Sequence, residues 1–226
     1  MTNTQFCKHY PYLYHMAEAG TWDSIKKLGL LSTLALTELF EITGDEKRKL
    51  VSERRPEMVQ ICHKKYGIVT IRDNKPITDS KLLNWLIDIS PREWYETLSR
   101  RVFFWTNKDR LDRLLNARAY RRHTHTVITV ETALLLERNN ERITLSPINS
   151  GAMPFGGSPR GVGTFCTLDQ WPDDEGPRSG KLRKPVVELA VEHSISDMQD
   201  IAIRVDEMKG GKLVKKIWAR VSGHGR

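Results

Sequence analysis

The sequence predicts an α+β fold, because helix-forming and strand-forming segments gather in different halves of the chain. Apolar residues recur at helical spacing mainly before residue 100, whereas short runs with strand alternation are concentrated after it. The 226 residues contain no internal repeat, low-complexity tract or interdomain linker. One domain over residues 1–226 is therefore expected.

The first well-defined element is a helix predicted over residues 22–28. Thr21 can cap its N-terminus and Gly29 can end it, and a short apolar run that ends at His15 precedes it. His15 is therefore expected on a strand edge or in a turn, near a helix N-terminus whose free N–H groups attract anions. Either the imidazole packs within the fold or it belongs to a ligand site.

Periodicity and turn-forming residues predict the remaining elements in chain order. Residues 102–105 are apolar on both faces and predict a central, buried strand. The Gly- and Pro-rich stretch 146–163 is too long for a simple connection and is predicted to be a binding loop. The other expected elements are helices over 34–40, 45–53, 80–89, 91–98, 107–115 and 131–137, a hairpin within 57–72, strands over 124–130, 143–145, 185–191 and 201–205, and a polar loop over 169–184.

The composition indicates a soluble protein of the cytoplasm. With 39% apolar residues the chain can bury a substantial core, yet it has no apolar stretch long enough to span a membrane and no secretory signal. Its cysteines, Cys7, Cys62 and Cys166, are odd in number and far apart, so they predict neither a disulfide framework nor a cysteine metal site. This usage suits a reducing compartment.

The formal charge of +8, from 36 Lys and Arg against 28 Asp and Glu, is unevenly distributed. Basic clusters interleaved with Gly can follow a phosphate backbone, but they can equally form a solvated face that keeps a protein in solution. The clusters are Arg118, Arg121 and Arg122; Arg178, Lys181, Arg183 and Lys184; and Lys209, Lys212, Lys215, Lys216, Arg220 and Arg226.

Glu188 is a carboxylate in an unusual place. It lies in the middle of the apolar run PVVELAVEHSI, where strand alternation puts it on the opposite face from Val187 and Leu189. A carboxylate there needs a partner or a solvent-lined cleft, unless it simply faces outward. The spacing alone leaves both interpretations open.

Three segments together resemble the ADP-ribosyltransferase fold: LYHMAEAGTWDSIKKLGLLS near the start, RVFFWT in the middle and PVVELAVEHSI near the end. The likeness is greatest to bacterial members that act on nucleic acids, such as the DarT toxins and the mRNA-modifying toxins of phage-defence systems. SERRPE, RDNKP, LSPINSG and PRG are also similar to a family of uncharacterised bacterial proteins. The resemblance implies a split β-sandwich core with an N-terminal helical portion.

The resemblance also implies which residues form the catalytic centre. The family's catalytic glutamate matches Glu188. Its first-strand histidine, which contacts the ribose and nicotinamide side of NAD, matches His15, preceded by Tyr14. Ala17 stands where the family often has Thr.

Further NAD-binding residues follow from the same likeness. The aromatic strand that supports the nicotinamide pocket matches the segment that contains Phe103 and Trp105. Arg72 is the candidate for an NAD-binding arginine, with a structural salt bridge as the alternative. The pyrophosphate of NAD needs N–H groups or arginines, which the loop with Asn149 and Arg160 can supply.

The implied activity is NAD-dependent mono-ADP-ribosylation of a nucleic acid, a base in RNA or single-stranded DNA, by a toxin with an antitoxin partner. The polar loop over 169–184 matches the loop that selects the acceptor, so Arg178, Lys181, Arg183 and Lys184 are expected to hold the phosphate backbone, as is the basic C-terminal tail. Trp171 or Trp218 would offer a stacking face. The alternatives are a transferase that acts on protein side chains, and a nucleic-acid-binding protein of the same fold without NAD chemistry.

Other motifs point to weaker candidates. His123 and His125 could be two ligands on one strand face, but no third ligand has suitable spacing, so no metal site is expected. A Cys166–His193 nucleophile pair has no local signature in its support. The glycines of residues 156–161 have the wrong spacing for a dinucleotide fingerprint.

Overall fold

The computed structural model describes residues 1–153, 157–172 and 185–221. Its helices are α1 (Asn3–His9), α2 (Trp22–Leu28), α3 (Thr33–Leu39), α4 (Gly44–Ser52), α5 (Asp79–Leu83), α6 (Pro91–Ser99), α7 (Lys108–Asn116), α8 (Thr132–Asn139) and α9 (Met198–Ile201). Its strands are β1 (Tyr12–Glu18), β2 (Leu30–Leu31), β3 (Val59–His63), β4 (Gly67–Ile71), β5 (Arg101–Trp105), β6 (Thr124–Glu131), β7 (Ile143–Ser146), β8 (Glu188–Glu192), β9 (Ser194–Ile195), β10 (Ala202–Lys209) and β11 (Lys212–Ala219).

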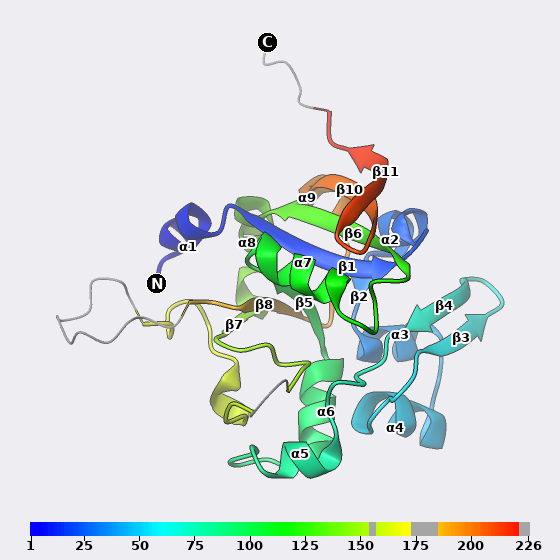
Figure 1. Cartoon of the computed structure of the whole chain (residues 1–226), viewed down its shortest axis with the longest axis vertical. Coiled ribbons are helices and arrows are strands. Elements are labelled where there is room, and N and C mark those ends of the chain that lie inside the picture. The colour runs from blue at the N-terminus through cyan, green and yellow to red at the C-terminus, as the bar shows by residue number, and fades with distance from the viewer. Residues whose placement is uncertain (154–156, 173–184, 222–226) are drawn as a thin grey trace.

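Seven strands form one antiparallel sheet in the order β11-β10-β6-β1-β5-β8-β7 (Figure 1). Two small sheets, β2 with β9 and β3 with β4, lie outside it. The combination of a large antiparallel sheet with separate helices confirms the predicted α+β class. The three segments that carry the family resemblance become β1, β5 and β8, which are neighbours in the sheet.

Helices cover both faces of this sheet. One face carries Leu13, Phe104 and Ile128 in a core that includes side chains from α2, α8 and α9. The other face carries Met16 and Val127, which pack with apolar residues of α7, the helix that crosses the front of the sheet in Figure 1. Successive residues of each strand alternate between these two cores, so β1 and β5 are apolar on both sides.

The sheet is nearly divided between β1 and β5. These strands share one registered pair, Tyr14 with Trp105, whereas β1 follows β6 along its whole length. Where the strands diverge, the imidazole Nδ1 of His15 reaches the Phe103 carbonyl oxygen at 2.8 Å. A side chain thus replaces the main-chain ladder, and it pairs with a half-buried carbonyl that the divergence would leave without a strand partner.

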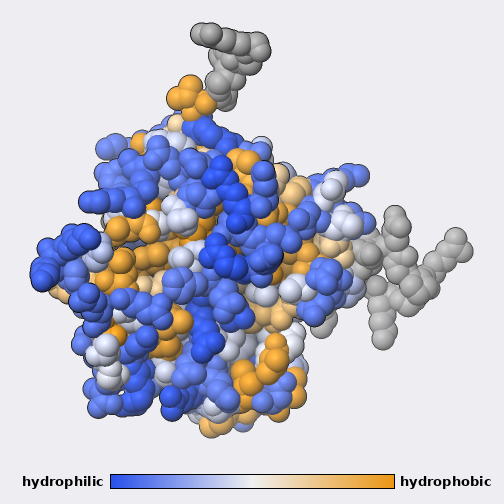
Figure 2. All heavy atoms as spheres, turned by 180° about the vertical axis from the view of Figure 1, so that it is seen from behind, coloured by the Kyte–Doolittle hydropathy of each residue, from blue (hydrophilic) through white to orange (hydrophobic). Residues whose placement is uncertain are grey.

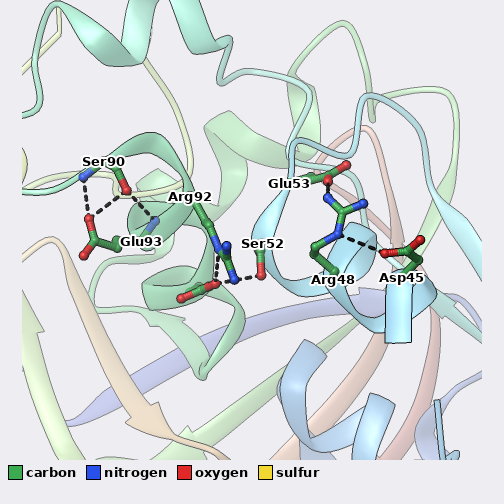
Figure 3. Close-up of polar contacts among 8 residues, drawn as sticks. Asp45, Arg48, Ser52, Glu53, Ser90, Arg92 and Glu93 are labelled. Atoms are coloured by element: carbon green, nitrogen blue, oxygen red, sulfur yellow. Dashed lines mark hydrogen bonds and ion pairs between the residues drawn. The ribbon is translucent and has the colours of Figure 1, made fainter. Parts of the chain in front are cut away.

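A second layer of α3, α4, α5, α6 and the β3–β4 hairpin lies below the sheet in Figure 1. In Figure 3, Ser52 of α4 and Arg92 of α6 meet one carboxylate, that of Glu96, at 2.8 and 2.9 Å. Ser90 and Glu93 cap α6 reciprocally, also drawn in Figure 3. Because α6 leads directly into β5, these contacts fix the direction in which β5 enters the sheet.

Seen from behind, the molecule is mostly hydrophilic, with apolar side chains in small patches (Figure 2). None of the helices in the described ranges combines the length and hydropathy that a membrane span requires.

Two expectations around the first helix are wrong. β1 lies in the middle of the sheet, so His15 is on a central strand and not at an edge or in a turn. Thr21 precedes α2, but its hydroxyl donates to the Glu18 carbonyl at 2.7 Å and accepts nothing from the helix. Gly29 ends α2 as predicted, with φ of 84°.

Two other expected elements have different lengths. The helix predicted over 80–89 is only Asp79–Leu83, because the backbone beyond it pairs with Arg160: the Ile87 N–H donates to the Arg160 carbonyl at 3.0 Å and the Arg160 N–H to the Trp85 carbonyl at 2.8 Å. The last predicted strand, 201–205, extends to Lys209, and a further strand follows it. Gly210 and Gly211, both with positive φ, make the turn, so Lys209, Lys212, Lys215 and Lys216 belong to a hairpin and not to a tail, while Arg226 lies outside the described residues.

Gly29 provides a test of this packing. A Cβ at Gly29 would lie 2.5 Å from the Ile195 carbonyl oxygen of β9, whereas a Cβ at Gly20, also at positive φ, meets nothing within 4 Å. We expect Gly20→Ala to cost about 1 kcal/mol of unfolding free energy, from backbone strain alone. Gly29→Ala should cost at least about 2 kcal/mol more, because the β2–β9 pair must move apart. Urea denaturation of both variants measures the difference, and equal losses would contradict the close approach.

Candidate active site

A cavity of about 280 Å³ lies where β1 and β5 diverge. Its wall combines residues from β1, β5 and β8 with residues from α7 and from the connections after β4 and β7. Six of the candidates from sequence analysis line it: His15, Arg72, Phe103, Trp105, Asn149 and Glu188. Residues from five separate segments of the chain therefore meet at one place.

Glu188 begins β8, opposite Trp105 in the neighbouring strand, and its side chain faces the cavity. The residue is only 4% exposed, so the outward-facing interpretation of its position is wrong. One carboxylate oxygen accepts hydrogen bonds from the Ser150 hydroxyl at 2.6 Å and the Ser150 N–H at 3.0 Å. Burial nevertheless raises the pKa of Glu188 to about 7, against these bonds and the positive charges of Arg160 and Arg110.

Arg160 holds the loop that presents Ser150. Its guanidinium is buried and donates to the carbonyl oxygens of Ser158, Asn149 and Ala152 at 2.8, 3.1 and 2.6 Å. Arg160 is absent from the cavity wall, so the structure does not place it where a pyrophosphate would bind. Its hydrogen bonds hold the connection after β7 in place, and this connection positions the two Ser150 donors to Glu188.

His15 is neutral in this environment. Burial lowers its pKa to about 4, and the charge of Arg72 acts in the same direction, against the hydrogen bond to Phe103 that favours protonation. Because the Phe103 carbonyl can only accept, Nδ1 carries the proton and Nε2 is left as an acceptor. The imidazole also packs against the Phe104 ring, with 5.6 Å between the two ring centres. The histidine thus offers a fixed acceptor instead of a positive charge.

Three guanidinium groups line the cavity, those of Arg55, Arg72 and Arg101. Arg72 lies 4.9 Å from the centre of the Tyr120 ring and forms no ion pair within the described residues, so a salt bridge does not explain its position. Its Nη1, and Nε of Arg101, are buried and have no hydrogen-bond partner in the part of the chain that the structure describes. Buried cationic N–H groups without partners are costly unless a ligand satisfies them, and an anion does so best.

Four residues of the cavity wall, Arg55, Arg101, Tyr120 and Ser150, carry no signal in the sequence that marks them as site residues. Arg55 donates to the Arg72 carbonyl, and burial lowers its pKa to about 10. Arg101 opens the aromatic strand, and Ser150 belongs to the loop predicted to bind a ligand. The sequence marked these segments as parts of a site, but no rule of spacing tells which side chain within a segment points into the cavity.

Tyr14 does not reach the cavity. It is not part of the cavity wall, although it packs against the core under α7 on the same face of β1 as Met16, which does line the cavity. Burial raises the pKa of its hydroxyl. Phe103 and Trp105, by contrast, contribute aromatic surface to the cavity wall.

The remaining candidates fall into two groups. Arg178, Lys181, Arg183 and Lys184 lie outside the described residues. Trp171 is buried in the core and cannot offer a stacking face, and Trp218 packs against Trp22 at 5.3 Å.

Neither of the other motifs forms a second centre. No group of metal-ligating side chains is present among the described residues, and the Nε2 of His125 pairs with the Tyr120 carbonyl. The ring nitrogens of His193 pair with Glu38 and Ser194, so His193 is not available to activate Cys166.

Comparison with known proteins gives a family but no activity. No curated protein and no solved structure matches the chain significantly. A family model described as a family of unknown function (DUF7002) matches residues 11–202, which include every residue of the cavity wall. The chain belongs to this family, DUF7002.

Proposed function

We propose that this protein is an NAD-dependent mono-ADP-ribosyltransferase with an ADP-ribosyltransferase-like split core. The supporting observation is that His15, Arg72, Phe103, Trp105 and Glu188, assigned from a resemblance between separate segments, line one cavity. The near division of the sheet between β1 and β5, and the adjacency of β1, β5 and β8, agree with the same proposal.

The size and charge of the cavity fit the nicotinamide riboside part of NAD. A volume of about 280 Å³ is at the lower end of small-molecule sites, which run from roughly 300 to 1,000 Å³. Phe103 and Trp105 would contact the nicotinamide ring, and the unpaired guanidinium N–H groups of Arg72 and Arg101 would bind the pyrophosphate. The adenosine half would extend beyond the enclosed part of the cavity.

The reaction would proceed through an oxocarbenium-like sugar. The bond between the ribose C1′ and the nicotinamide nitrogen breaks, and its electron pair leaves with nicotinamide. A Glu188 carboxylate about 4 Å from the sugar, at an effective dielectric near 20, would stabilise the growing positive charge by about 4 kcal/mol. That is roughly a thousandfold in rate. The acceptor then bonds to C1′ and gives up its proton to the Glu188 carboxylate or to solvent.

Two groups would prepare this step. The neutral His15 would accept a hydrogen bond from a ribose hydroxyl at its Nε2, and this bond would orient the sugar. Ser150 holds one oxygen of Glu188 through two hydrogen bonds, so the carboxylate cannot rotate away. Since the pKa of Glu188 is about 7, the cationic pyridinium of bound NAD would shift this group toward its ionised form.

The acceptor that we propose is a base in RNA or single-stranded DNA, modified by a toxin that an antitoxin protein neutralises in a defence system of the cell. The basic excess of the chain supports a polyanionic acceptor. The alternatives are an acceptor on a protein side chain, and a nucleic-acid-binding protein of this fold that has lost NAD chemistry.

Incubation with NAD labelled in its adenylate part, together with mixed RNA, single-stranded DNA and protein, tests the proposal. Wild-type protein should transfer label to nucleic acid. Glu188→Gln should reduce transfer about a thousandfold while NAD binding persists, because the amide keeps the shape but loses the charge. Glu137→Gln, on the exposed side of α8, is the matched control and should retain full transfer.

Each other outcome has a definite meaning. Label on protein alone would support the side-chain alternative, and the absence of NAD binding would support the non-enzymatic one. Full transfer by Glu188→Gln would remove Glu188 from the mechanism.

The pH dependence of stability tests the buried carboxyl without any assay of activity. The folded state raises the pKa of Glu188 from 4.5 to about 7, so the group carries no penalty below about pH 4.5, and its cost grows as the pH rises from there to about 7 and is nearly constant above it. Glu188→Gln should therefore become more stable than wild type with rising pH, by up to about 3 kcal/mol at pH 8. Denaturation at pH 4.5 and pH 8 measures this, and a difference independent of pH would contradict the assignment.

A further inference from the structure

Two basic clusters that are far apart in the sequence lie side by side in the fold. One is the connection after α7, with Arg118, Arg121 and Arg122, and the other is the β10–β11 hairpin, with Lys209 and the lysines of β11. Figure 1 shows the turn of this hairpin against the C-terminal end of α7. We call the two segments together, residues 118–122 and 209–216, the basic surface.

The contact between the segments is close and defined. A Cβ at Gly211 would lie 2.5 Å from the Asn116 side-chain nitrogen, and a Cβ at Gly210 would lie 3.3 Å from the Arg121 carbonyl oxygen. Lys209 is registered opposite both Thr124 of β6 and Lys212 of β11. The sheet itself therefore fixes where these cations stand, and only glycines allow the turn to approach so closely.

The cations of the basic surface form no ion pair within the described ranges, although Glu207 and Asp206 of β10 are registered opposite Lys215 and Lys216. Arg118, Arg121, Arg122, Lys209, Lys212, Lys215 and Lys216 are all exposed, and none forms an ion pair with another described residue. Elsewhere, Arg48, Arg92 and Arg138 are paired with carboxylates. Single exposed lysines such as Lys27 and Lys49 are paired with no described residue, so what distinguishes the basic surface is the grouping of its charges. Unpaired charges held together by the backbone repel one another, and a polyanion relieves this repulsion.

The basic surface begins at the wall of the cavity. Tyr120, which lines the cavity and packs on Arg72, lies between Arg118 and Arg121 in one turn of chain. The buried side of this turn thus belongs to the candidate active site, while its exposed side carries the first charges of the basic surface. A chain of phosphates on β11 and residues 118–122 would reach the vicinity of the cavity mouth.

We infer that the basic surface binds the phosphate backbone of a single-stranded nucleic acid and leads it toward the cavity. The binding itself is independent of NAD, whereas its role in presenting an acceptor base rests on the proposed function. Lysines on an edge strand such as β11 also discourage strand pairing between molecules. That role requires neither the arginines after α7 nor their contact with the hairpin.

The test is the binding of fluorescein-labelled 12-nucleotide oligo(U) and oligo(dT), measured by fluorescence anisotropy without NAD between 50 and 200 mM KCl. Each phosphate neutralised on a single strand contributes about 0.7 to the slope of log affinity against log salt. Lys209→Gln with Lys212→Gln and Lys216→Gln should therefore reduce this slope by about 2 and weaken binding more than tenfold at the lowest salt. Comparison of the two oligonucleotides distinguishes RNA from DNA as the preferred strand.

The matched control changes the same net charge at exposed lysines on α2, α4 and α5, with Lys27→Gln, Lys49→Gln and Lys81→Gln. It should bind nearly as wild type. A second triple variant, Arg118→Gln with Arg121→Gln and Arg122→Gln, should weaken binding as much as the lysine variant does. Thermal unfolding midpoints equal to that of wild type show that each variant is folded.

Three results would overturn the inference. Equal weakening by the control variant would mean that net charge alone attracts the strand. Unchanged binding by the arginine variant would mean that the strand does not reach residues 118–122, which lie next to the cavity. Binding to phosphatidylserine vesicles but to neither oligonucleotide would assign the basic surface to a membrane. If the oligonucleotides bind but no label is transferred from NAD, the basic surface stands and the proposed function fails.

Discussion

The divergence of β1 from β5 is the constraint on which the candidate site depends. In a continuous sheet, His15 and Glu188 would be kept apart, since alternation puts His15 on the side of Phe104 and Glu188 on the side of Phe103. Because only Tyr14 and Trp105 remain registered, both side chains reach the same cavity. The hydrogen bond from the imidazole to the Phe103 carbonyl supplies the contact that the interrupted ladder lacks.

The cavity also carries a cost in stability that the rest of the fold must offset. A buried carboxyl with a pKa near 7 and guanidinium N–H groups without partners are both unfavourable in a ligand-free protein. The loop after β7 limits that cost, since Arg160 satisfies three carbonyl oxygens and places Ser150 against Glu188. Groups that are destabilising before binding and satisfied by a ligand are characteristic of binding and catalytic sites.

Local signals predicted much of the fold correctly. Gly29 marked the end of α2, residues 102–105 read as a central strand because they are apolar on both faces, and the β3–β4 hairpin followed from β-branched runs around a turn. The failures have a common cause in tertiary structure. The helical pattern of 80–89 gives way after Leu83 to backbone pairing with Arg160, and β11 is an exposed edge strand whose lysines hide its alternation.

The residues of the candidate site were also predicted only in part. Resemblance proposed Glu188 and His15 as candidates because their segments have recognisable sequences, and both residues line the same cavity. The resemblance could not show that the buried Arg160 guanidinium donates to carbonyl oxygens of its own loop. An arginine in a Gly-rich loop fits the binding of a phosphate equally well. Nor could the resemblance show that Arg101 lines the cavity, which depends on β5 leaving its neighbour.

A crystal structure with a non-hydrolysable carbocyclic analogue of NAD is the most direct test of the central claim. We expect the nicotinamide ring to lie against Phe103 and Trp105, with the ribose between the imidazole of His15 and the carboxylate of Glu188. An analogue bound elsewhere on the protein, or a cavity that stays closed to saturating analogue, would contradict this claim.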